Sequence, residues 1–410
     1  MTNPENFSDF KLDPQLIKAL NHMNYTKPTP IQAAAIPVAI EGRDIMGSAQ
    51  TGTGKTAAFA IPLVQHILSN EKGTALVLTP TRELGKQVMD VIHQLTQSRI
   101  QTAFLIGGEP MQKQIKQLKR MPRIIVGTPG RINDHLERGL LKLNTCGFLV
   151  LDETDRMLDM GFSVQLERIF KYMPERRQSL MFSATLPRKI LSMADQYLNN
   201  PERIAVGSTI EPAKNIKQSV IRLEDGSKYT ELVTQLSERE GSVIVFVKTK
   251  RGADRIAKKL DASGFKSEAM HGDLKQSRRE RVLRNYRDAK FRVLIATDVA
   301  ARGLDIPHIA HVINYDLPQV PEDYIHRIGR TARAGAKGEA VCFLSPKDHD
   351  KWHAIEQLMS PDKKSEGGST RPAGKGKGKG KGKGRGPKNK TRWSTARKRK
   401  QKNVAAKKKA

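Results

Sequence analysis

The sequence has 410 residues and a net charge of +30 at pH 7, with 72 Lys and Arg against 42 Asp and Glu. This length allows two to three domains, and so large a basic excess indicates a polyanionic partner. Its two cysteines, Cys146 and Cys342, lack the paired spacing of a zinc or redox motif, so we expect small core residues in a reducing compartment. The polar N-terminus and the absence of a long apolar run exclude a membrane span, which predicts a soluble cytoplasmic protein.

Short apolar segments alternate with helical patterns along the chain. Such alternation predicts two α/β domains with parallel sheets covered by helices on both faces. We place the first domain at 1–206, a polar linker at 207–217 and the second domain at 218–360. The expected strands are 75–79, 123–126, 148–151 and 179–182 in the first set, and 242–247, 292–296, 311–314 and 340–344 in the second. Polar clusters follow several of these strands, at the carboxyl-terminal sheet edge where ligands of such folds bind.

A glycine-rich loop occupies residues 49–56, between a short strand and an apolar helix. Gly52 and Gly54 allow the backbone N–H groups to face a phosphate at the N-terminus of the helix. Lys55 would then reach the β and γ phosphates of a nucleoside triphosphate, and the Thr56 hydroxyl would coordinate Mg²⁺. Ala49 replaces the usual first glycine at a less demanding position. The loop predicts a nucleotide triphosphatase.

Three carboxylates, Asp152, Glu153 and Asp155, follow an apolar strand within four positions. Buried acids at a strand end are costly unless they serve a cation, although a solvated turn is the simpler alternative. Beside the glycine-rich loop, they predict a magnesium ligand at Asp152 with a base next to it.

The composition changes after residue 360. From Lys363 to the end there are 20 Lys and Arg and a single acid, Glu366, and residues 374–386 alternate Gly with Lys or Arg. Such a segment cannot bury enough apolar surface to offset its chain entropy, so residues 361–410 are predicted to be a disordered tail. We interpret it as a nonspecific phosphate-binding arm; a solubilising tail or a localisation signal is the alternative.

Several segments, in order, resemble the motifs of the bacterial-type DEAD-box ATP-dependent RNA helicases over residues 7–333. They are 27–32 (Lys-Pro-Thr-Pro-Ile-Gln), 49–56, 80–84 (Pro-Thr-Arg-Glu-Leu), 152–155, 183–185 (Ser-Ala-Thr) and 324–333. The resemblance implies two tandem RecA-like domains with a cleft between them for ATP, Mg²⁺ and RNA. The chain departs from the family pattern at Thr154, where Ala is usual, and at Ala332, where Gly is commonest. We expect the chemistry to survive Thr154.

The resemblance also implies residue roles. The catalytic set is Lys55, Asp152, Glu153, Arg330 and Arg333, the two arginines acting as arginine fingers. ATP would be bound by Phe7, Gln32, Ala49, Gln50, Thr51, Gly52, Thr53, Gly54, Lys55, Thr56 and Asp305, with Gln32 reading adenine and Phe7 stacking nearby. Mg²⁺ would be held by Thr56 and Asp152. Coupling residues would be Asp155, Ser183, Thr185, His326 and Arg327, and RNA contacts would be Arg82, Gly107, Gly108, Thr128, Arg131, Gln276, Arg279, Thr297, Arg302 and Gly303.

Two of these roles carry structural expectations. Arginines at 327, 330 and 333 would share one face if the segment were helical. His326 and Arg327 would tie this segment to the opposite domain, as Asp155 would from its side, and Ser183–Thr185 would hydrogen-bond to the acidic motif.

The expected function is ATP-driven unwinding or remodelling of structured RNA by a monomer, in ribosome assembly or RNA turnover. A processive DNA helicase shares the ATP motifs, but residues 27–32 and 80–84 favour the RNA family. An RNA chaperone acting through the tail alone would not need the catalytic set. An ATP-gated clamp that remodels RNA–protein complexes with little unwinding is compatible with every motif.

Overall fold

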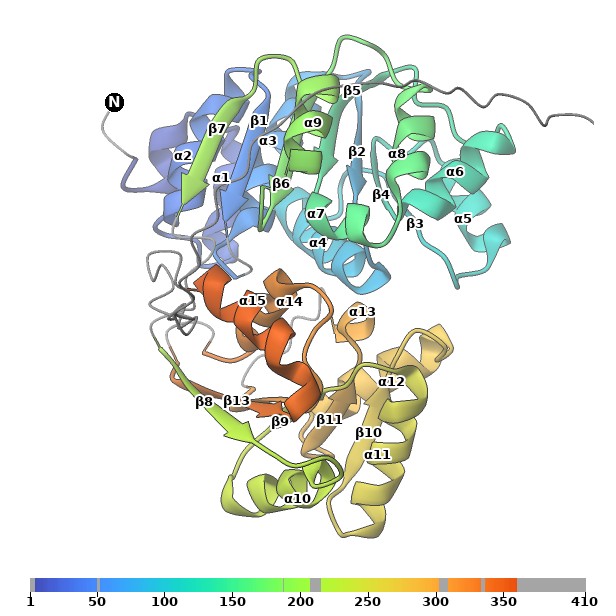
Figure 1. The fold of residues 1–410 in the computed structure, drawn as a ribbon. Coiled ribbons are helices and arrows are strands. Elements are labelled where there is room, and N and C mark those ends of the chain that lie inside the picture. Colours follow the sequence, from blue (N-terminus) through green and yellow to red (C-terminus); the bar gives the residue numbers. More distant parts are fainter. Residues whose placement is uncertain are drawn as a thin grey trace, which may run out of the picture. The chain divides into compact units, whose positions relative to one another are not determined.

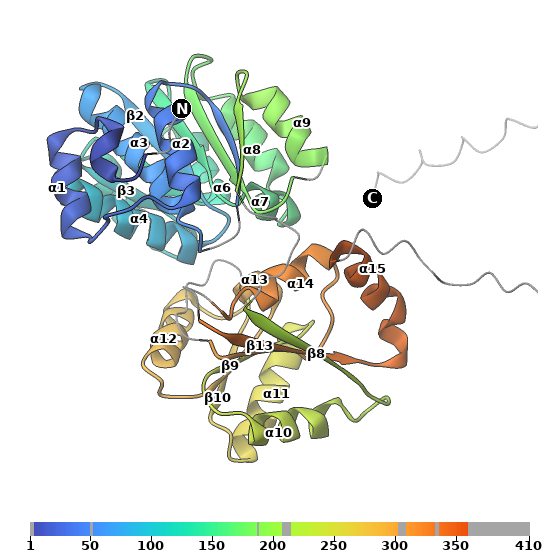
Figure 2. The same ribbon diagram turned by 90° about the vertical axis from the view of Figure 1, so that its left-hand side faces the viewer.

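The computed structural model describes residues 4–49, 52–186, 188–206, 215–301, 309–332 and 336–359, with the side chain of Val299 excepted. The predicted tail at 361–410 and most of the predicted linker lie outside these residues. The described chain contains two entirely parallel sheets, one of seven strands and one of six. Figures 1 and 2 show helices on both faces of each sheet, which confirms the predicted α/β class.

The first sheet has the strand order β3-β4-β2-β5-β6-β1-β7. Its strands are β1 (Ile45–Ala49), β2 (Thr74–Leu78), β3 (Thr102–Leu105), β4 (Ile124–Gly127), β5 (Cys146–Leu151), β6 (Gln178–Ser183) and β7 (Glu202–Val206). Its helices are α1 (Pro14–His22), α2 (Pro30–Ile40), α3 (Lys55–Ser69), α4 (Arg82–Thr96), α5 (Met111–Leu118), α6 (Pro129–Glu137), α7 (Thr154–Asp159), α8 (Ser163–Phe170) and α9 (Arg188–Tyr197). The four strands predicted for the first set correspond to β2, β4, β5 and β6.

The second sheet has the strand order β10-β11-β9-β12-β13-β8. Its strands are β8 (Ile216–Arg222), β9 (Val243–Phe246), β10 (Ser267–Met270), β11 (Val293–Ala296), β12 (His311–Asn314) and β13 (Gly338–Leu344). Its helices are α10 (Lys228–Glu238), α11 (Lys250–Ala262), α12 (Gln276–Arg287), α13 (Asp298–Ala301), α14 (Pro321–Ile328) and α15 (His349–Met359).

The strand predictions missed the sheet margins. The strands missed are those at the ends of the two sheets, β3 and β7 in the first and β8 and β10 in the second. An edge strand is covered less completely than a central one, so its sequence lacks a continuous apolar run; β8, for example, alternates exposed and partly buried residues. β8 also begins at Ile216, inside the segment that the sequence suggested as linker.

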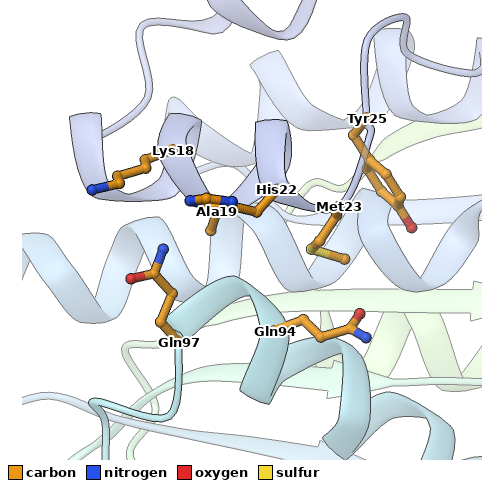
Figure 3. Close-up of a pocket in the computed structure, with 7 residues that line it drawn as sticks. All are labelled: Lys18, Ala19, His22, Met23, Tyr25, Gln94 and Gln97. Atoms are coloured by element: carbon orange, nitrogen blue, oxygen red, sulfur yellow. The ribbon is translucent and has the colours of Figure 1, made fainter.

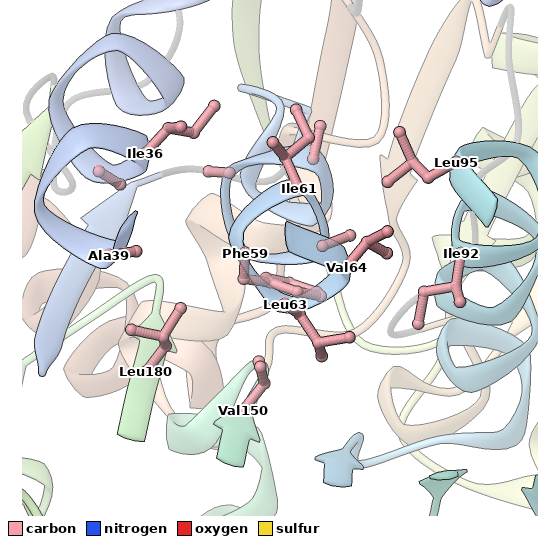
Figure 4. Packing of buried hydrophobic residues seen from close by; sticks show 14 of the residues in the cluster. Ile36, Ala39, Phe59, Ile61, Leu63, Val64, Ile92, Leu95, Val150 and Leu180 are labelled. Carbon is pink, nitrogen blue, oxygen red and sulfur yellow. The ribbon is translucent and has the colours of Figure 1, made fainter. Parts of the chain in front are cut away.

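Each sheet separates two apolar cores because successive residues of a strand point to opposite faces. In β5, Phe148 and Val150 pack into one core, whereas Leu149 and Leu151 pack into the other. Figure 4 shows the first of these cores, in which Phe59 and Leu63 of α3 lie between α2, α4 and the strands. The phosphate-loop helix is thus held rigidly against the sheet.

Parallel pairing brings the carboxyl ends of the strands to one edge of the first sheet. Leu78 of β2 is in register with Gly127 of β4 and with Leu151 of β5. Ser48 of β1 is in register with Ser183 of β6. The loops that carry the phosphate, acidic and Ser-Ala-Thr motifs therefore begin at neighbouring points. In the described part of the chain, no helix has the length and apolar content needed to cross a bilayer.

Candidate nucleotide and RNA site

The phosphate loop leads directly into α3. Gly52 and Gly54 have φ of 90° and 93°, and a Cβ at Gly54 would lie 2.5 Å from the amide nitrogen of Gln32. Only glycine fits that position without strain. Lys55 is the first residue of the helix, and its Nζ donates a 2.5 Å hydrogen bond to the Ala49 carbonyl. Gln50 and Thr51 of this motif lie outside the described residues.

Gln32 connects the segment 27–32 to the phosphate loop. Its Nε2 donates to the Gly54 carbonyl at 3.1 Å, and its Oε1 accepts from the Thr29 backbone N–H at 2.9 Å. The side chain is 4% exposed. Both ends of the amide are therefore engaged within the protein, and any hydrogen bond to adenine would have to add to, or replace, these bonds.

Phe7 is not available as a stacking platform in this structure. Its ring is 4% exposed and packs on Phe10 and Tyr25, with centroid separations of 5.7 and 5.8 Å. Tyr25, by contrast, is partly exposed. Sequence reasoning overlooked Tyr25, although an aromatic residue seven positions before Gln32 was a usable signal. The pair suggests that Tyr25 offers the ring face and that Phe7 supports it from behind.

The carboxylates of Asp152, Glu153 and Asp155, here called the acidic corner, are buried. Asp152 is 2% exposed, and its Oδ1 has no hydrogen-bond partner among the described residues. Burial, together with the charge of Glu153, raises the pKa of Asp152 to about 7, against the opposing effect of Lys55. Burial likewise lowers the pKa of Lys55, although the carboxylates of Glu153, Asp152 and Asp155 oppose the shift.

This corner fits a magnesium ion. A buried carboxylate oxygen without a partner is costly, and a cation would satisfy it. Across the described residues, no cluster of three or more His, Cys, Asp or Glu could hold a metal alone. Mg²⁺ needs no such cluster, because it is usually held by one or two protein oxygens, waters and the phosphates of the nucleotide.

Glu153 forms an ion pair inside this corner. Its Oε2 accepts a 2.6 Å hydrogen bond from Nη1 of Arg156, and the two side chains are 4% and 1% exposed. Glu153 itself has φ of 50°, in the left-handed region, and directly precedes α7. The sequence analysis assigned no role to Arg156.

Thr154 is fully buried at the start of α7. Its hydroxyl is placed to donate to the carbonyls of Leu151, at 3.3 Å, and Phe182, at 3.2 Å. These carbonyls belong to the adjacent strands β5 and β6. The hydroxyl that distinguishes this chain from the usual family pattern thus joins two strand ends through backbone carbonyls.

Asp155 joins the acidic motif to the Ser-Ala-Thr segment. Its Oδ2 accepts from the backbone N–H of Thr185 and from its hydroxyl, both at 3.0 Å, and from the Ala184 N–H at 3.2 Å. Ser183 donates from its hydroxyl to the Thr185 carbonyl at 2.6 Å. The expected hydrogen bonds between the two motifs are therefore present.

The predicted RNA contacts of the first domain form one surface. The Arg82 guanidinium lies against Gly107 and Gly108 so closely that a Cβ at Gly108 would collide with it. Arg131 donates to the Glu109 carbonyl at 3.1 Å, and Thr128 precedes α6. Glycine at these positions makes room for the Arg82 guanidinium to lie directly on the backbone.

A buried pair that the sequence analysis missed supports this surface from behind. Gln114 donates from Nε2 to the Ile106 carbonyl at 2.9 Å, and its Oε1 lies 3.1 Å from Nε2 of His135. Both side chains are almost completely buried. Neither residue stands in a recognisable motif, and only the tertiary structure reveals their connection to the Gly107–Gly108 loop.

In the second domain, Arg327 lies inside its own fold. Its Nε and Nη2 bind both carboxylate oxygens of Asp298 at 2.5 and 2.7 Å, and its Nη1 donates to Asn314 Oδ1 at 3.0 Å and the Asp316 carbonyl at 2.6 Å. The side chain is 2% exposed and packs over Phe246. In this structure the Arg327 donors are therefore engaged within the second domain, and any tie to the opposite domain would have to add to, or replace, these hydrogen bonds.

The three arginines do not share one helical face, which was the condition for a common surface. α14 ends at Ile328, so Arg330 lies in the following turn, and Arg333 lies outside the described residues. Gly329 caps the helix, which is why the three-residue spacing does not continue as a stripe. Arg330 is 3% exposed, with Nε donating to the His326 carbonyl at 3.2 Å. Ala332 has φ of 55°, a left-handed conformation in which glycine would be unstrained.

Of the remaining predicted residues, some lie in the described part of the second domain and the others lie outside the described residues. Gln276 and Arg279 are partly exposed in the first turn of α12, and Thr297 follows β11 and is 8% exposed. Arg302, Gly303 and Asp305 lie outside the described residues.

A surface pocket of about 550 Å³ lies elsewhere on the first domain. Figure 3 shows its lining, which comes from α1, the loop after it and the end of α4. Its lining includes Tyr25 but none of the residues predicted from the sequence to be catalytic or to bind ATP or RNA. The motifs at the sheet edge, and not this pocket, therefore define the candidate site.

Two parallel α/β domains, the first with a phosphate loop beside a buried acidic corner, define a nucleoside triphosphatase with tandem domains. Residues 29–193 match the family described as DEAD/DEAH box helicase, and residues 227–335 match the helicase conserved C-terminal domain. The chain belongs to the DEAD-box ATP-dependent RNA helicases, as the motif resemblance indicated.

Individual relatives agree. The DEAD-box ATP-dependent RNA helicase CshA of Geobacillus kaustophilus is 42% identical over 355 residues, which make up 86% of this chain and 76% of the relative. CshA of Bacillus licheniformis is 44% identical over 354 residues, 86% of this chain and 73% of the relative. Among solved structures, S. cerevisiae Dbp5 bound to RNA and ADP BeF3 is 31% identical with a TM-score of 0.79, covering 87% of this chain and 94% of its own.

Proposed function

We propose that the chain hydrolyses ATP in response to RNA and uses the cycle to unwind or remodel structured RNA. The observation that carries the proposal is the buried corner of the first domain, where Asp152 and Glu153 lie beside the phosphate-loop Lys55. Such a corner suits a nucleotide that brings its own phosphates and cation. Relatives named as ATP-dependent RNA helicases, and a structural neighbour bound to RNA and ADP BeF3, support the same assignment.

In this proposal the first domain binds the nucleotide. The backbone of the phosphate loop cradles the phosphates, and Lys55 neutralises charge on the β and γ groups. Asp152 and Thr56 would hold Mg²⁺, which supplies further neutralisation of the transferred phosphoryl group. Glu153 orients the attacking water and accepts its proton on a carboxylate oxygen.

The second domain contributes the arginines. Arg330 and Arg333 would stabilise charge on the phosphoryl group, in the manner of arginine fingers. Because the two halves of the catalytic set lie on different domains, turnover requires closure of the cleft between them. If RNA also bridges both domains, ATP and RNA each stabilise the closed state, and their affinities are coupled.

RNA recognition would depend on strand shape. Arg82 with Gly107 and Gly108, Thr128 with Arg131, and the second-domain residues Gln276, Arg279, Thr297, Arg302 and Gly303 offer donors and open backbone to phosphates and 2′-hydroxyls. None of these groups forms a base-reading pattern. We therefore expect binding without sequence preference.

The test is RNA-stimulated ATP turnover by the wild-type chain and by Glu153→Gln. We expect RNA oligonucleotides to stimulate turnover far more than DNA oligonucleotides, and Glu153→Gln to lower turnover about 10²-fold or more. Duplex unwinding that persisted at full rate in Glu153→Gln would refute the ATP-driven mechanism. Full ATPase stimulation with no strand separation would favour an ATP-gated clamp that remodels RNA–protein complexes.

The setting we propose is a cytoplasmic monomer that acts on ribosomal precursors or in RNA turnover. The support is the basic C-terminal sequence and the bacterial relatives. Truncation after Pro361 should weaken RNA affinity and flatten its salt dependence while basal ATPase survives. Crosslinking of full-length and truncated chains to cellular RNA would identify the substrates, and unchanged RNA affinity on truncation would refute the role of the tail.

A further inference from the structure

Arg156 is among the largest fully buried side chains of the described chain. It lies in the first turn of α7, and its Nη1 donates to Glu153 Oε2 at 2.6 Å. Its Nε and Nη2 have no hydrogen-bond partner among the described residues. The guanidinium therefore has one strong interaction, and that interaction is with the predicted base.

Fold stability alone does not account for such a group. A buried ion pair is often no more stabilising than well-packed apolar side chains of similar volume, because both charges lose their hydration. Two further unsatisfied donors add to the cost. An arginine at this position is therefore better explained by an effect on Glu153.

The geometry gives that effect a direction. Glu153 stands in the left-handed region, immediately before the helix, and Arg156 follows one turn later. Only Oε2 of Glu153 is hydrogen-bonded within the described residues, so Oε1 is left for a water molecule. A charged hydrogen bond at one oxygen fixes the orientation of the whole carboxylate.

The balance of charges in the acidic corner supports the same effect of Arg156 on Glu153. Three carboxylates, Asp152, Glu153 and Asp155, are buried with two cations, Lys55 and Arg156. Without Arg156, the neighbouring carboxylates of Asp152 and Glu153 would repel each other with Lys55 as the remaining counter-charge. That repulsion would displace the movable Glu153 side chain from its place.

We propose that Arg156 is a positioning residue for Glu153, holding Oε2 so that Oε1 faces the attacking water. The inference rests on the proposed function, in which Glu153 orients that water. Arg156 would act in the chemical step and would contribute little to the binding of ATP.

A double-mutant cycle tests this inference. Arg156→Met is made in the wild-type chain and in Glu153→Gln, and RNA-stimulated kcat, the KM for ATP and thermal unfolding are measured for each. We expect Arg156→Met to lower kcat about 10²-fold, comparable with loss of a general base, with KM for ATP changed less than about threefold. In Glu153→Gln, where no base remains to be positioned, the same substitution should change the residual single-turnover rate less than about threefold.

Two controls separate positioning from structure. Arg156→Lys keeps a charge without the planar fork, so it should recover kcat to within about tenfold of wild type. Arg168→Met removes an exposed arginine that pairs with Glu137 on the same domain, and should leave both kcat and KM unchanged. If Arg156→Met does not fold, the cycle is run with Arg156→Lys in both the wild-type and the Glu153→Gln background, so that the same substitution is compared in each.

The outcomes are distinct. An equal loss of rate in both backgrounds would show that Arg156 acts independently of Glu153 and would overturn the inference, as would a raised KM with unchanged kcat. A faster Arg156→Met enzyme would overturn it too, since Arg156 would then be restraining the base. If Glu153→Gln itself retained full turnover, the proposed function would fail first, whatever the behaviour of Arg156.

Discussion

Two buried charge clusters, one in each domain, are bonded in opposite ways. In the first domain, Asp152 has a buried carboxylate oxygen with no hydrogen-bond partner among the described residues, and Arg156 has two such nitrogens. In the second, Arg327 is buried just as deeply, but its guanidinium binds Asp298 through two hydrogen bonds and two further oxygens through Nη1. Both clusters bury charge, but only the Arg327 cluster satisfies most of its donors and acceptors within the protein.

This difference separates a binding site from a structural element. Unsatisfied buried groups cost free energy in the isolated protein, and a ligand that satisfies them recovers it. An arginine that uses four of its five N–H donors within its own domain has little left to offer a ligand, and its removal would leave the partly buried Asp298 without its partner. Changes in the first corner should mainly alter catalysis, and changes at Arg327 should mainly alter stability.

The largest effect is expected at Lys55. Lys55→Met removes the phosphate-loop cation, so RNA-stimulated ATP turnover should fall about 10²- to 10³-fold. ATP with Mg²⁺ at 100 times its Kd should stabilise the wild-type chain by about 2.7 kcal/mol, and this stabilisation should be lost in the variant. Turnover assays and thermal unfolding with and without nucleotide measure both. Lys72→Met, at an exposed lysine of the same domain, is the control; a Lys55→Met chain that kept its turnover would contradict the site.

The matching change in the second domain is Arg327→Met. Because Asp298 would lose its bidentate partner in the interior, we expect the free energy of unfolding to fall by about 3–5 kcal/mol. Urea denaturation monitored by circular dichroism measures this, with Arg278→Met at an exposed position of α12 as the control, expected to change it by less than about 0.5 kcal/mol. A stable Arg327→Met chain that had lost only RNA-stimulated turnover would instead support the coupling role that the motif resemblance implies for Arg327.

The two cysteines report on the domains separately. Burial raises the pKa of both Cys146 and Cys342 to about 12, from 9.0, so at pH 8 their thiolate fraction should be about a thousandfold below that of an unfolded chain. Each single variant keeps one thiol: Cys342→Ala keeps Cys146 in the first domain, and Cys146→Ala keeps Cys342 in the second. ATP with Mg²⁺ at 100 times its Kd should slow disulfide-reagent labelling of Cys146 about 100-fold if labelling requires opening of the first domain.

Cys342 sharpens the comparison, because the second domain alone should gain no such protection from nucleotide. Equal protection of both thiols would mean that the domains open as one unit. The same pKa shifts predict a stability contribution that is complete below pH 9 and is lost as pH rises toward 12, since only the unfolded thiols ionise in that range. Unfolding followed at several alkaline pH values checks the sign.

The features of the fold that could be predicted from the sequence are those encoded in one contiguous segment. The central strands and the phosphate loop are contiguous patterns, so the apolar run of β5 and the glycines before Lys55 could be predicted directly. The edge strands could not, because β8 pairs with β13 more than a hundred residues later and has only a weak pattern of its own. A strand of that kind is determined by its partner.

The site followed the same rule. The hydrogen bonds between Asp155 and Thr185 were expected because the motifs themselves indicated them. The partners of Glu153 and Arg327 were not, because a sequence does not show which side chain turns inward, and Arg156 has the appearance of an ordinary helix-surface residue. The regular spacing of the arginines left open whether the segment is helical throughout, and the structure ends α14 at Ile328.

A smaller effect is expected at Thr154. Thr154→Ala removes the hydroxyl that joins β5 and β6 and leaves a buried carbonyl with one fewer donor, so stability should fall by about 1 kcal/mol. ATP turnover should change no more than a few-fold, because the hydroxyl is bonded to backbone carbonyls and not to a catalytic group. Chemical denaturation and steady-state kinetics measure the two effects. A larger loss of turnover than of stability would place Thr154 within the catalytic machinery of the first domain.

The smallest effect is expected at Ala332, in the second domain. An alanine with φ of 55° is strained by roughly 1–2 kcal/mol, and Ala332→Gly would relieve this strain. The gain is partly cancelled because glycine also increases the entropy of the unfolded chain, by about 0.4–1 kcal/mol, so the net stabilisation should lie between zero and about 1.6 kcal/mol, with a midpoint below about 1 kcal/mol. Matched denaturation curves with Ala301→Gly, at a buried helical position where glycine can only weaken the fold, give the opposite sign as a control. If Ala332→Gly instead raised RNA-stimulated kcat severalfold, the left-handed alanine would be limiting how Arg330 is presented, and the second domain would have a strained group serving catalysis after all.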